Sequence, residues 1–318
     1  MYKPTRFLIA GLLLALLTSA CTQLLPSNNE KTLQGEITVS GAFALYPLMI
    51  TWADEFQEIH PGVEFEISSG GAGKGMEDIL ANKTDIGMVS REITPAEETQ
   101  GAYPVAVAKD AVFAMINAQN PVLSDLLEYG VSRETLVKIF ISGEINTWGS
   151  VVGDSEITDE IHVYTRTETC GAAETWSKYL GGGQMDLLGS GRFGDSGIIR
   201  ALQNDPLGIG YSNQIYAFGL GDLPPSGTLI LPIDLNGNGQ VDQDENLDTR
   251  QKATAAVASG LYHTPPARVL YLVTHQKPTG TLQAFLAWVL RDGQTYVDSL
   301  GYVGLPDAQL QAALEKIR

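Results

Sequence analysis

Apolar and polar positions in the segment from Ile37 to Ile93 follow two alternating periods. The run ITVS, with its β-branched residues, predicts a strand at 37–40, and Gly41 permits a tight turn. Apolar positions with helical spacing come next, at Leu45, Leu48, Met49, Trp52 and Phe56. The order repeats with a strand at 63–67, a glycine-rich turn and a helical face at Met76, Ile79 and Leu80. Two helix N-termini near the carboxyl ends of adjacent parallel strands would form a cleft that attracts anions.

The rest of the chain continues the alternation. Strand-like segments occur at 106–117 and 162–165, and helical patterns occur at 133–142, 172–180 and 196–204. This order predicts an α/β fold with mostly parallel sheets. The chain closes with another helical face, at Leu282, Phe285, Leu286, Val289 and Leu290.

Four strings, spread in order along the chain, resemble those of a known family. They are DIGMVSRE at 85–92, IFISGEINTWGSV at 139–151, RTETCGAAETW at 166–176 and GIGYSN at 208–213. The chain resembles the phosphate-type solute-binding proteins of bacterial ABC importers over residues 37–306. Ordered matches of this kind are more specific than any single glycine-rich turn.

The resemblance implies a two-lobed, periplasmic-binding-protein-like (type II) fold with two crossover strands, Val105 to Ile116 and Arg268 to Thr274. Lobe 1 would take residues 36–112 and 262–318, and lobe 2 would take residues 113–261. It also implies a monomeric binding protein, not an enzyme, that closes around a small anion for an ABC permease. The alternative is a signalling or scaffold domain that keeps the fold without the transport role.

The family's ligand site maps onto twelve residues of this chain: Ala42, Phe43, Ala44, Gly71, Ala72, Gly73, Ser90, Arg91, Arg166, Cys170, Gly171 and Ala172. Arg166 is the strongest of these candidates, because a planar guanidinium can hold two oxygens of one anion. A surface arginine at the end of a strand is the plainer interpretation of Arg166. An ordinary turn is the plainer interpretation of Ser90 and Arg91.

This site departs from the family's pattern because most side-chain hydroxyl groups are missing. Family members that bind phosphate usually present hydroxyls from the three turns, where this chain has Ala42, Phe43, Ala72, Cys170 and Ala172. Losing several donors would weaken phosphate binding by about 3 to 5 kcal/mol. The site then either holds another or larger anion, with Phe43 as an apolar wall, or has lost its small ligand.

Cys170 stands where the family's pattern has a serine. A thiol at a helix N-terminus beside Arg166 is predicted to be shifted toward thiolate, which would raise its reactivity. A nucleophile also needs a base, and no histidine is linked to this thiol by sequence. Replacement of a serine donor is therefore favoured over an enzymatic role.

The first twenty residues predict export. Lys3 and Arg6 precede an apolar run at 7–17, and small residues lead to Cys21. This pattern resembles a lipoprotein signal peptide (1–20), after which Cys21 is lipidated and residues 21–35 form a polar tether on the outer side of the membrane. An ordinary secretory peptide or an uncleaved anchor is the alternative.

Net charge excludes one class of partner. The chain carries 20 basic and 37 acidic residues, a formal net charge of −17 at pH 7. Nucleic acid is therefore not an expected partner. An anionic ligand is not excluded, because distant surface charge is screened beyond about 8 Å at physiological salt.

The segment IDLNGNGQVDQDENL matches an EF-type calcium loop. Oxygen-bearing groups stand at the alternating positions that wrap one hard cation, namely Asp234, Asn236, Asn238, the Gln240 carbonyl, Asp242 and Glu245. A strand is predicted before it at 228–233 and a helix after it at 246–259, so a structural Ca²⁺ site of modest affinity is expected. A solvated Asn/Asp/Gly turn is the alternative.

Overall fold

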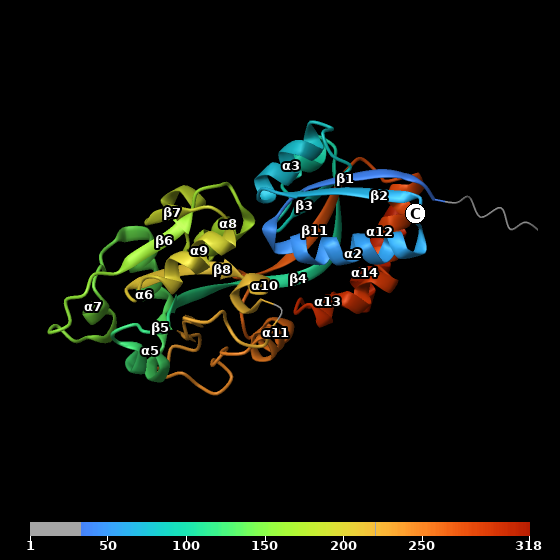
Figure 1. Ribbon diagram of the computed structural model, residues 1–318. Helices are drawn as coiled ribbons and strands as arrows, with labels where there is room; N and C mark the ends of the chain where they lie inside the picture. Colours follow the sequence, from blue (N-terminus) through green and yellow to red (C-terminus); the bar gives the residue numbers. More distant parts are fainter. Residues whose placement is uncertain (1–32, 220) are drawn as a thin grey trace, which may run out of the picture. The chain divides into compact units, whose positions relative to one another are not determined.

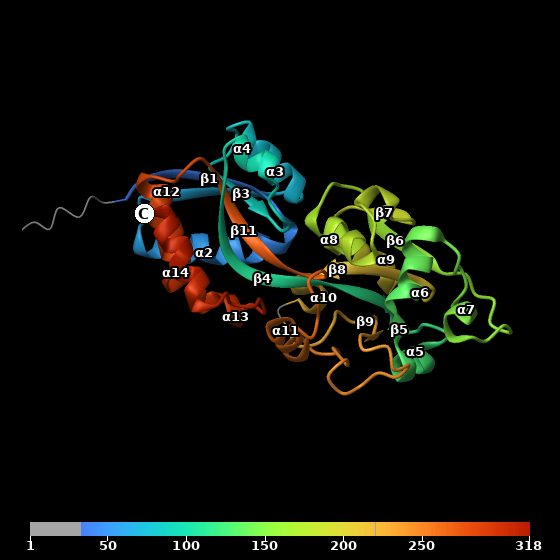
Figure 2. The ribbon, with the colours of Figure 1, turned by 180° about the vertical axis from the view of Figure 1, so that it is seen from behind.

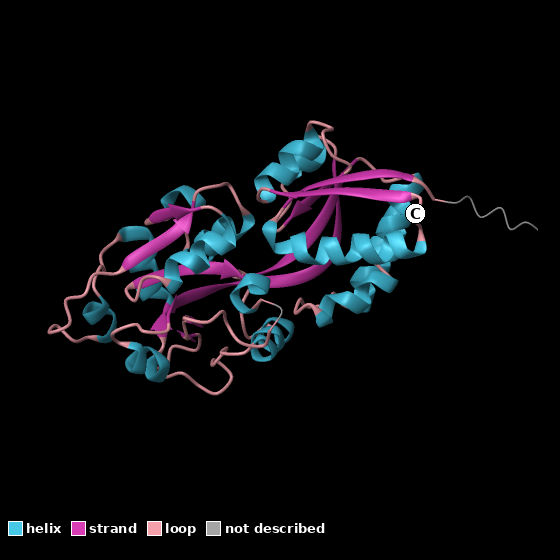
Figure 3. Cartoon of the chain, in the orientation of Figure 1, coloured by secondary structure: helices cyan, strands magenta, loops and turns pink. Residues whose placement is uncertain are grey.

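Nine strands form one mixed sheet in the part of the chain that the structure, a computed structural model, describes: residues 33–219 and 221–318 (Figures 1 and 3). The strands pair in the order β2, β1, β3, β11, β4, β8, β6 and β7, and β9 pairs with β4. Their bounds are β1 Gly35–Gly41, β2 Val63–Ser69, β3 Ile86–Val89, β4 Ala102–Asn117, β6 His162–Arg166, β7 Ser190–Arg192, β8 Gly208–Asn213, β9 Thr228–Ile230 and β11 Ala267–His275. A separate pair joins β5 (Val131–Ser132) to β10 (Ile233–Asp234).

Strand direction divides this sheet into two groups. β1 pairs parallel with β2 and β3, which we call the first half-sheet. β6 pairs parallel with β7 and β8, which we call the second half-sheet. The pairings of β11 and β4 are all antiparallel. The predicted α/β fold is therefore confirmed, with antiparallel pairing confined to the two long strands that join the half-sheets.

The long strand β4 changes its partner in the middle. Residues up to Ala111 pair with β11, whereas residues from Val112 onward pair with β8 and β9. The first part therefore belongs to the hydrogen-bond ladder of the first half-sheet and the second part to that of the second. β4 and β11 coincide with the two runs that the sequence predicts as crossover strands.

Helices follow most strands, as the hydrophobic periodicity predicts. The α-helices are α2 Tyr46–Ile59, α3 Ala72–Leu80, α4 Pro95–Thr99, α5 Leu123–Tyr129, α6 Arg133–Val137, α7 Trp148–Val152, α8 Gly171–Leu180, α9 Gly194–Gln203, α10 Gln214–Phe218, α11 Arg250–Ser259, α12 Gly280–Val289, α13 Thr295–Ser299 and α14 Asp307–Ile317. Short 3₁₀ turns lie at η1 Phe43–Leu45, η3 Gln184–Asp186 and η4 Asp292–Gln294, and η2 Lys138–Ser142 is π-helical. None of the described helices is long and apolar enough to cross a bilayer.

The C-terminal helices pack beside the first half-sheet. α12 and α13 contact α2, and α14 contacts β4 and α12. Figures 1 and 2 show these helices, in red, next to α2 from both sides. The last helical pattern of the sequence therefore packs against an element from the start of the chain.

Two predictions concern other parts of the chain. Residues 1–32 and 220 are not described, so the signal peptide, Cys21 and most of the tether lie outside the described residues. The helix predicted at 246–259 begins at Arg250, because the Thr249 side chain accepts a hydrogen bond from the Lys252 N–H and caps the first turn there.

Candidate functional site

Three of the predicted site segments are turns at the start of helices. The first, Ala42 to Ala44, follows β1 and leads through η1 into α2. The second, Gly71 to Gly73, follows β2 and begins α3. The third, Cys170 to Ala172, lies after β6 and begins α8. Because β1 and β2 are parallel neighbours, their carboxyl ends lie at the same edge of the sheet.

The second turn lies close to both of the others. The N–H groups of Gly70 and Gly71 donate to the carbonyl of Gly41 over 2.9 and 3.0 Å. A Cβ on Gly71 would lie 2.6 Å from the carbonyl oxygen of Thr169, and Gly71 has a positive φ of 95°. Only glycine therefore lets the second and third turns approach this closely. The structure thus brings turns from both half-sheets to one place.

Hydrogen bonding separates the N–H groups of these turns into two sets. Ala42 donates to Met88 O at 2.8 Å, Gly71 to Gly41 O at 3.0 Å and Cys170 to Gln184 Oε1 at 3.2 Å. The other six have no acceptor within residues 33–219 and 221–318: Phe43, Ala44, Ala72, Gly73, Gly171 and Ala172. The first N–H groups of a helix have no partner inside that helix. The turns therefore hold six backbone donors without an acceptor among the described residues.

Arg166 ends β6 with its side chain entirely buried. Its Nε donates to Glu168 Oε1 over 2.6 Å, its Nη1 lies 3.0 Å from Asp195 Oδ2, and its guanidinium lies 5.2 Å from the centre of the Phe43 ring. Neither Nη1 nor Nη2 makes a hydrogen bond of good geometry, although both lie near carboxylate oxygens. Burial alone would lower the pKa of Arg166, but the charge of Asp195 and its neighbours raises it, so the group stays charged.

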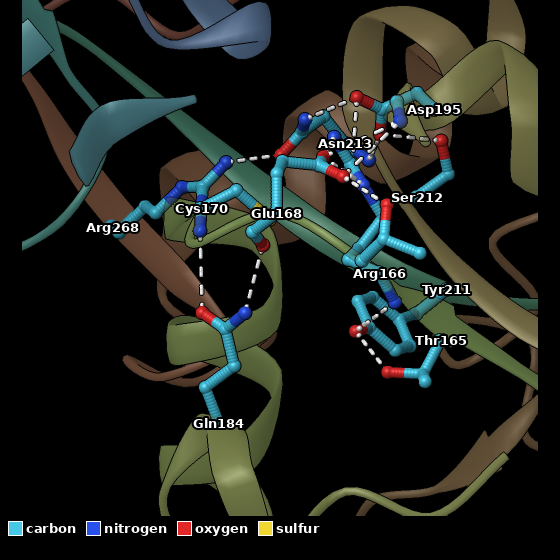
Figure 4. Close-up of polar contacts among 12 residues, drawn as sticks. Thr165, Arg166, Glu168, Cys170, Gln184, Asp195, Tyr211, Ser212, Asn213 and Arg268 are labelled. Atoms are coloured by element: carbon cyan, nitrogen blue, oxygen red, sulfur yellow. Dashed lines mark hydrogen bonds and ion pairs between the residues drawn. The ribbon is translucent and has the colours of Figure 1, made fainter. Parts of the chain in front are cut away.

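Two carboxylates lie against the guanidinium of Arg166 (Figure 4). Asp195, in the first turn of α9, is fully buried and accepts hydrogen bonds from Ser212 Oγ at 2.9 Å and from Asn213 N and Nδ2 at 2.8 Å. Glu168 accepts the Gly194 N–H at 3.3 Å, at the start of the same helix. Arg166 is therefore held in place by two carboxylates, and an incoming anion would have to compete with them for its two terminal nitrogens.

Ser90 and Arg91, the remaining predicted pair, are placed differently from each other. Ser90 is buried after β3 and contacts the third turn. The Arg91 guanidinium binds Glu97 over 3.0 and 2.6 Å and lies 3.2 Å from Glu174. Burial would lower the pKa of Arg91, but Glu97 outweighs burial and raises it. The Arg91 side chain is thus held by two carboxylates, one of which, Glu174, lies in the first turn of α8.

The prediction of a thiolate at Cys170 was wrong. The side chain is buried, and burial raises the pKa of the thiol to about 11 in spite of the nearby Arg166 charge. Desolvation disfavours the anion more than the neighbouring cation favours it. His162 lies elsewhere, with its Nδ1 2.8 Å from Asp205 Oδ2. Cys170 is therefore a protonated, buried side chain at neutral pH.

Sequence reasoning missed three residues that shape this site: Glu168, Gln184 and Asp195. Glu168 lies two positions after Arg166, which is a local signal that could have been used. Gln184 braces the third turn, because its Nε2 donates to Glu168 O at 2.8 Å while its Oε1 accepts the Cys170 N–H. Neither Gln184 nor Asp195 carries a local signal, since each reaches the site only through tertiary packing.

The predicted calcium loop forms a closed set of side-chain contacts. Asp234 accepts the N–H groups of residues 237–239, and the buried Glu245 accepts those of Leu235, Asn236 and Asp242. The side-chain amides of Asn236 and Asn238 donate to the same oxygen of Asp242 over 2.7 and 2.9 Å. Nowhere in the described residues do three or more His, Cys, Asp or Glu side chains adopt a metal-binding arrangement. The loop is therefore held by its own hydrogen bonds.

Comparison with known proteins gives a family match over most of the chain. The model of the PBP superfamily domain matches residues 26–293. Proteins named phosphate-binding protein PstS are similar over nearly the whole chain: one from Methanocaldococcus jannaschii is 24% identical over 92% of this chain and 88% of its own length. Another, from Pseudomonas aeruginosa, is 24% identical over 98% of this chain and 96% of its own length. A Bacillus subtilis PstS is 27% identical, but the match spans only 59% of that protein.

Solved structures share the fold at low sequence identity. A candidate phosphate ABC transporter substrate-binding protein of Clostridium perfringens, crystallised with bound phosphate, superposes with a TM-score of 0.70. It is 20% identical, and the match covers 86% of this chain and all of that one. An ABC-type phosphate transport receptor from Vibrio cholerae gives a TM-score of 0.62 at 17% identity, covering 85% and 100%.

Proposed function

The chain belongs to the PBP superfamily, and from that premise we propose that it captures a small anion, phosphate first among the candidates, for an ABC importer. The named relatives are phosphate-binding proteins, which supports this ligand class. The observation that carries the proposal is the set of six N–H groups without an acceptor among the described residues, in turns that meet near the buried Arg166, whose guanidinium lies over the Phe43 ring. A dehydrated oxyanion needs many directed donors, and helix N-termini supply them together with a favourable dipole.

The proposed site differs from a hydroxyl-rich phosphate site in its chemistry. Backbone N–H groups and Arg166 would provide most donors, with Ser90 as the one hydroxyl among the twelve predicted residues. Each missing hydroxyl removes roughly 0.5 to 1.5 kcal/mol of hydrogen bonding. We therefore expect a weaker affinity for phosphate than a site with hydroxyls at all three turns would give. The Phe43 ring, packed on the guanidinium, supplies apolar wall.

Closure of two lobes is the proposed mechanism of capture. The lobes would comprise residues 36–112 with 262–318, and residues 113–261. This division is supported by the change of partner in β4 between Ala111 and Val112. Because the first and second turns belong to one lobe and the third turn and Arg166 to the other, only the closed state presents all donors to one anion. A permease would recognise that state.

Calorimetry tests the proposal. Wild-type protein is titrated with phosphate, sulfate, molybdate and small carboxylates, and at least one is expected to bind in the micromolar range. Arg166→Lys keeps the charge but loses the planar fork, and Arg166→Met loses both, so we expect at least tenfold and hundredfold weaker binding, respectively. Arg192→Met is the matched control, since Arg192 lies over the Tyr164 ring and outside the three turns. No binding across the whole panel would contradict the proposal and favour a scaffold role.

Attachment to the membrane through Cys21 is the second part of the proposed function. The sequence pattern of the first 21 residues supports an exported lipoprotein, and the relatives' printed names are those of phosphate-binding proteins. Cells expressing the chain are expected to incorporate labelled fatty acid into it and to retain it in the membrane fraction. Cys21→Ala should abolish both, and unchanged labelling of this variant would contradict the anchor.

We also propose that the loop from Asp234 to Glu245 binds structural Ca²⁺. Support comes from the oxygen-bearing residues at EF-type positions and from the convergence of Asn236, Asn238 and Asp242. For Ca²⁺ to bind, the side-chain amides of Asn236 and Asn238 must turn their oxygens toward the ion. Glu245 must also release the backbone N–H groups that it accepts and bind the ion instead. Calcium titration in a calorimeter, repeated with Asp242→Asn, tests this. No heat of binding at millimolar Ca²⁺ would contradict it.

A further inference from the structure

A continuous series of buried polar contacts leads from Arg166 to the strands that join the half-sheets (Figure 4). The first contact is the ion pair between Arg166 Nη1 and Asp195 Oδ2 at 3.0 Å. The second runs from Asn213, whose Nδ2 donates to the same Asp195 oxygen over 2.8 Å. In the third, Arg268 Nη2 donates to Asn213 Oδ1. Asn213 therefore joins the carboxylate of one ion pair to the guanidinium of another.

The series ends between the two long strands. Arg268, on β11, donates from Nε and Nη2 to both oxygens of Asp110 on β4, over 2.8 and 3.0 Å. The two residues are direct partners in the strand register. β4 changes from β11 to β8 only one residue beyond Asp110, and Asn213 is the register partner of Val112. The contacts therefore lie at the junction of the half-sheets.

A branch of this series reaches the third turn. Arg268 Nη1 donates to Thr175 Oγ1 over 3.2 Å, and Thr175 lies in α8, the helix whose first residues are Gly171 and Ala172. Arg268 thus contacts α8, whose first residues supply two of the free N–H groups. Through Asn213 it is also connected to Asp195, the ion-pair partner of Arg166. Rotation of β11 against β8 would displace both connections together.

Burial makes these contacts sensitive to geometry. Asp110, Asp195 and Asn213 are at most 2% exposed, and Arg268 is 6% exposed. A buried charged group that loses its partner has no water to replace it, so the contacts persist only in arrangements that satisfy all members. Asn213 suits the central position because its amide both donates to Asp195 and accepts from Arg268.

We infer that Asn213 and Arg268 are positioning residues that make the orientation of Arg166, and so the anion affinity, depend on the arrangement of β4 and β11. This inference rests on the proposed anion-binding function. It predicts that breaking the Asn213 contacts weakens anion binding although Asn213 is not among the twelve predicted ligand residues. It also predicts that the weakening requires Arg166, because Asn213 acts through it.

Two substitutions and a control test this in the full-length protein. Asn213→Asp keeps the shape and the acceptor for Arg268 but places a carboxylate against Asp195, and Asn213→Leu removes both contacts. Each is expected to weaken binding of the best anion of the panel at least tenfold. Asn117→Leu is the control, because Asn117 is equally buried but donates to Leu202 O instead. It should change the affinity less than twofold.

A double-mutant cycle separates positioning from general damage. In an Arg166→Lys background, the Asn213 substitutions should cost less than threefold in affinity. An equal loss with and without the arginine would overturn the inference, as would an unchanged affinity in a folded Asn213→Asp variant. Circular dichroism melts establish whether each variant is folded. If Asn213→Leu is unfolded, the result for Asn213→Asp decides.

Hydrogen exchange distinguishes failure of this inference from failure of the proposed function. If wild-type protein binds none of the anions, the function fails, but the coupling is still measurable without ligand. Arg166→Lys should then change amide exchange of peptides covering 106–113 and 266–271 at least threefold. The same substitution should have no such effect when Asn213 is already Asp. Exchange in these peptides that does not respond to Arg166→Lys would overturn the inference.

Discussion

Gly171 and Ser90 lie so close that a Cβ added to Gly171 would be 2.2 Å from Ser90 Oγ and 2.4 Å from Ser90 O. Ser90 follows β3 in the first half-sheet, whereas Gly171 begins α8 beside the second. Because real Cβ atoms do not approach backbone oxygens this closely, only glycine allows this contact between the two parts of the site. The close approach gives the first prediction.

Gly171→Ala should prevent the approach of the third turn to Ser90. We expect at least a thirtyfold loss of anion affinity, with the circular dichroism spectrum unchanged, because the turns no longer meet. Gly197→Ala in α9 is the matched control, since its added Cβ would make only an ordinary contact, 3.4 Å from Arg192 Cβ. Wild-type affinity in folded Gly171→Ala would contradict this account of the contact.

Restoring a hydroxyl should strengthen phosphate binding. Ala172→Thr adds one at a free N–H position of the third turn, and a new hydrogen bond is worth roughly 0.5 to 1.5 kcal/mol, about 2- to 13-fold in affinity. Both alanines are buried in the same core, but only Ala172 is one of the six positions with a free N–H group, so Ala173→Ser, one residue later, should not improve binding. Titration calorimetry measures both, and equal affinities for Ala172→Thr and wild type would argue against this position.

The thiol of Cys170 should react slowly at neutral pH. Its pKa of about 11 leaves little thiolate at pH 8, and burial limits access. Alkylation with iodoacetamide, followed by mass spectrometry of the peptide that contains Cys170, should be slow in native protein and fast in denaturant. Rapid labelling of the native thiol at pH 7 would contradict the assignment.

The same raised pKa sets a direction for stability. The unfolded thiol, with an ordinary pKa near 9, loses its proton before the folded one does, so stability due to Cys170 is complete below pH 9 and is lost as the pH rises toward 11. Cys170→Ala removes this contribution. In urea titrations, the free energy of unfolding of wild type should therefore fall relative to that of Cys170→Ala between pH 9 and pH 11. A difference between the two proteins that does not change with pH would contradict this prediction.

The Asp110–Arg268 pair should matter for stability mainly when one partner is left alone. Arg268→Met leaves the Asp110 carboxylate buried without its cation, so we expect destabilisation of about 3 to 5 kcal/mol. Burial raises the pKa of Asp110 already, which favours a neutral partner in the variant. Asp110→Leu combined with Arg268→Met should recover part of the loss in urea unfolding. A double variant as unstable as the sum of the two single ones would contradict this.

Chelation should weaken the second lobe if the loop from Asp234 to Glu245 holds calcium. Ca²⁺ at 100 times its dissociation constant stabilises the folded state by about 2.7 kcal/mol. Excess chelator should then lower the melting temperature of wild type but not of Asp242→Asn. Identical wild-type melts with and without chelator would reject the site.

The sequence predicts the strand–turn–helix units because their signals are local. Leu48, Met49, Trp52 and Phe56 recur at helical spacing, and all four are buried on one face of α2. The sequence also places Arg166 at the end of a strand. It predicts the glycine-rich turn at Gly71 but not the close approach of that turn to Thr169, because the two residues lie about a hundred positions apart.

The remaining features depend on tertiary contacts that no local pattern encodes. The pairing of Arg91 with Glu97 and Glu174 is one of them, because only the fold brings Glu174 near that arginine. The pKa of Cys170 was predicted with the wrong sign because burial, which the sequence does not specify, outweighs the nearby charge. Asp195 was missed because it reaches Arg166 only through tertiary packing.

The central claim is that the unpartnered N–H groups of the three turns and the guanidinium of Arg166 hold one anion. A crystal structure of the protein grown with its best-binding anion measures this directly. We predict density for the anion within 3.2 Å of Arg166 and of N–H groups from Phe43, Gly73 and Gly171. Anion density elsewhere, or an anion that touches none of these turns, would contradict the account.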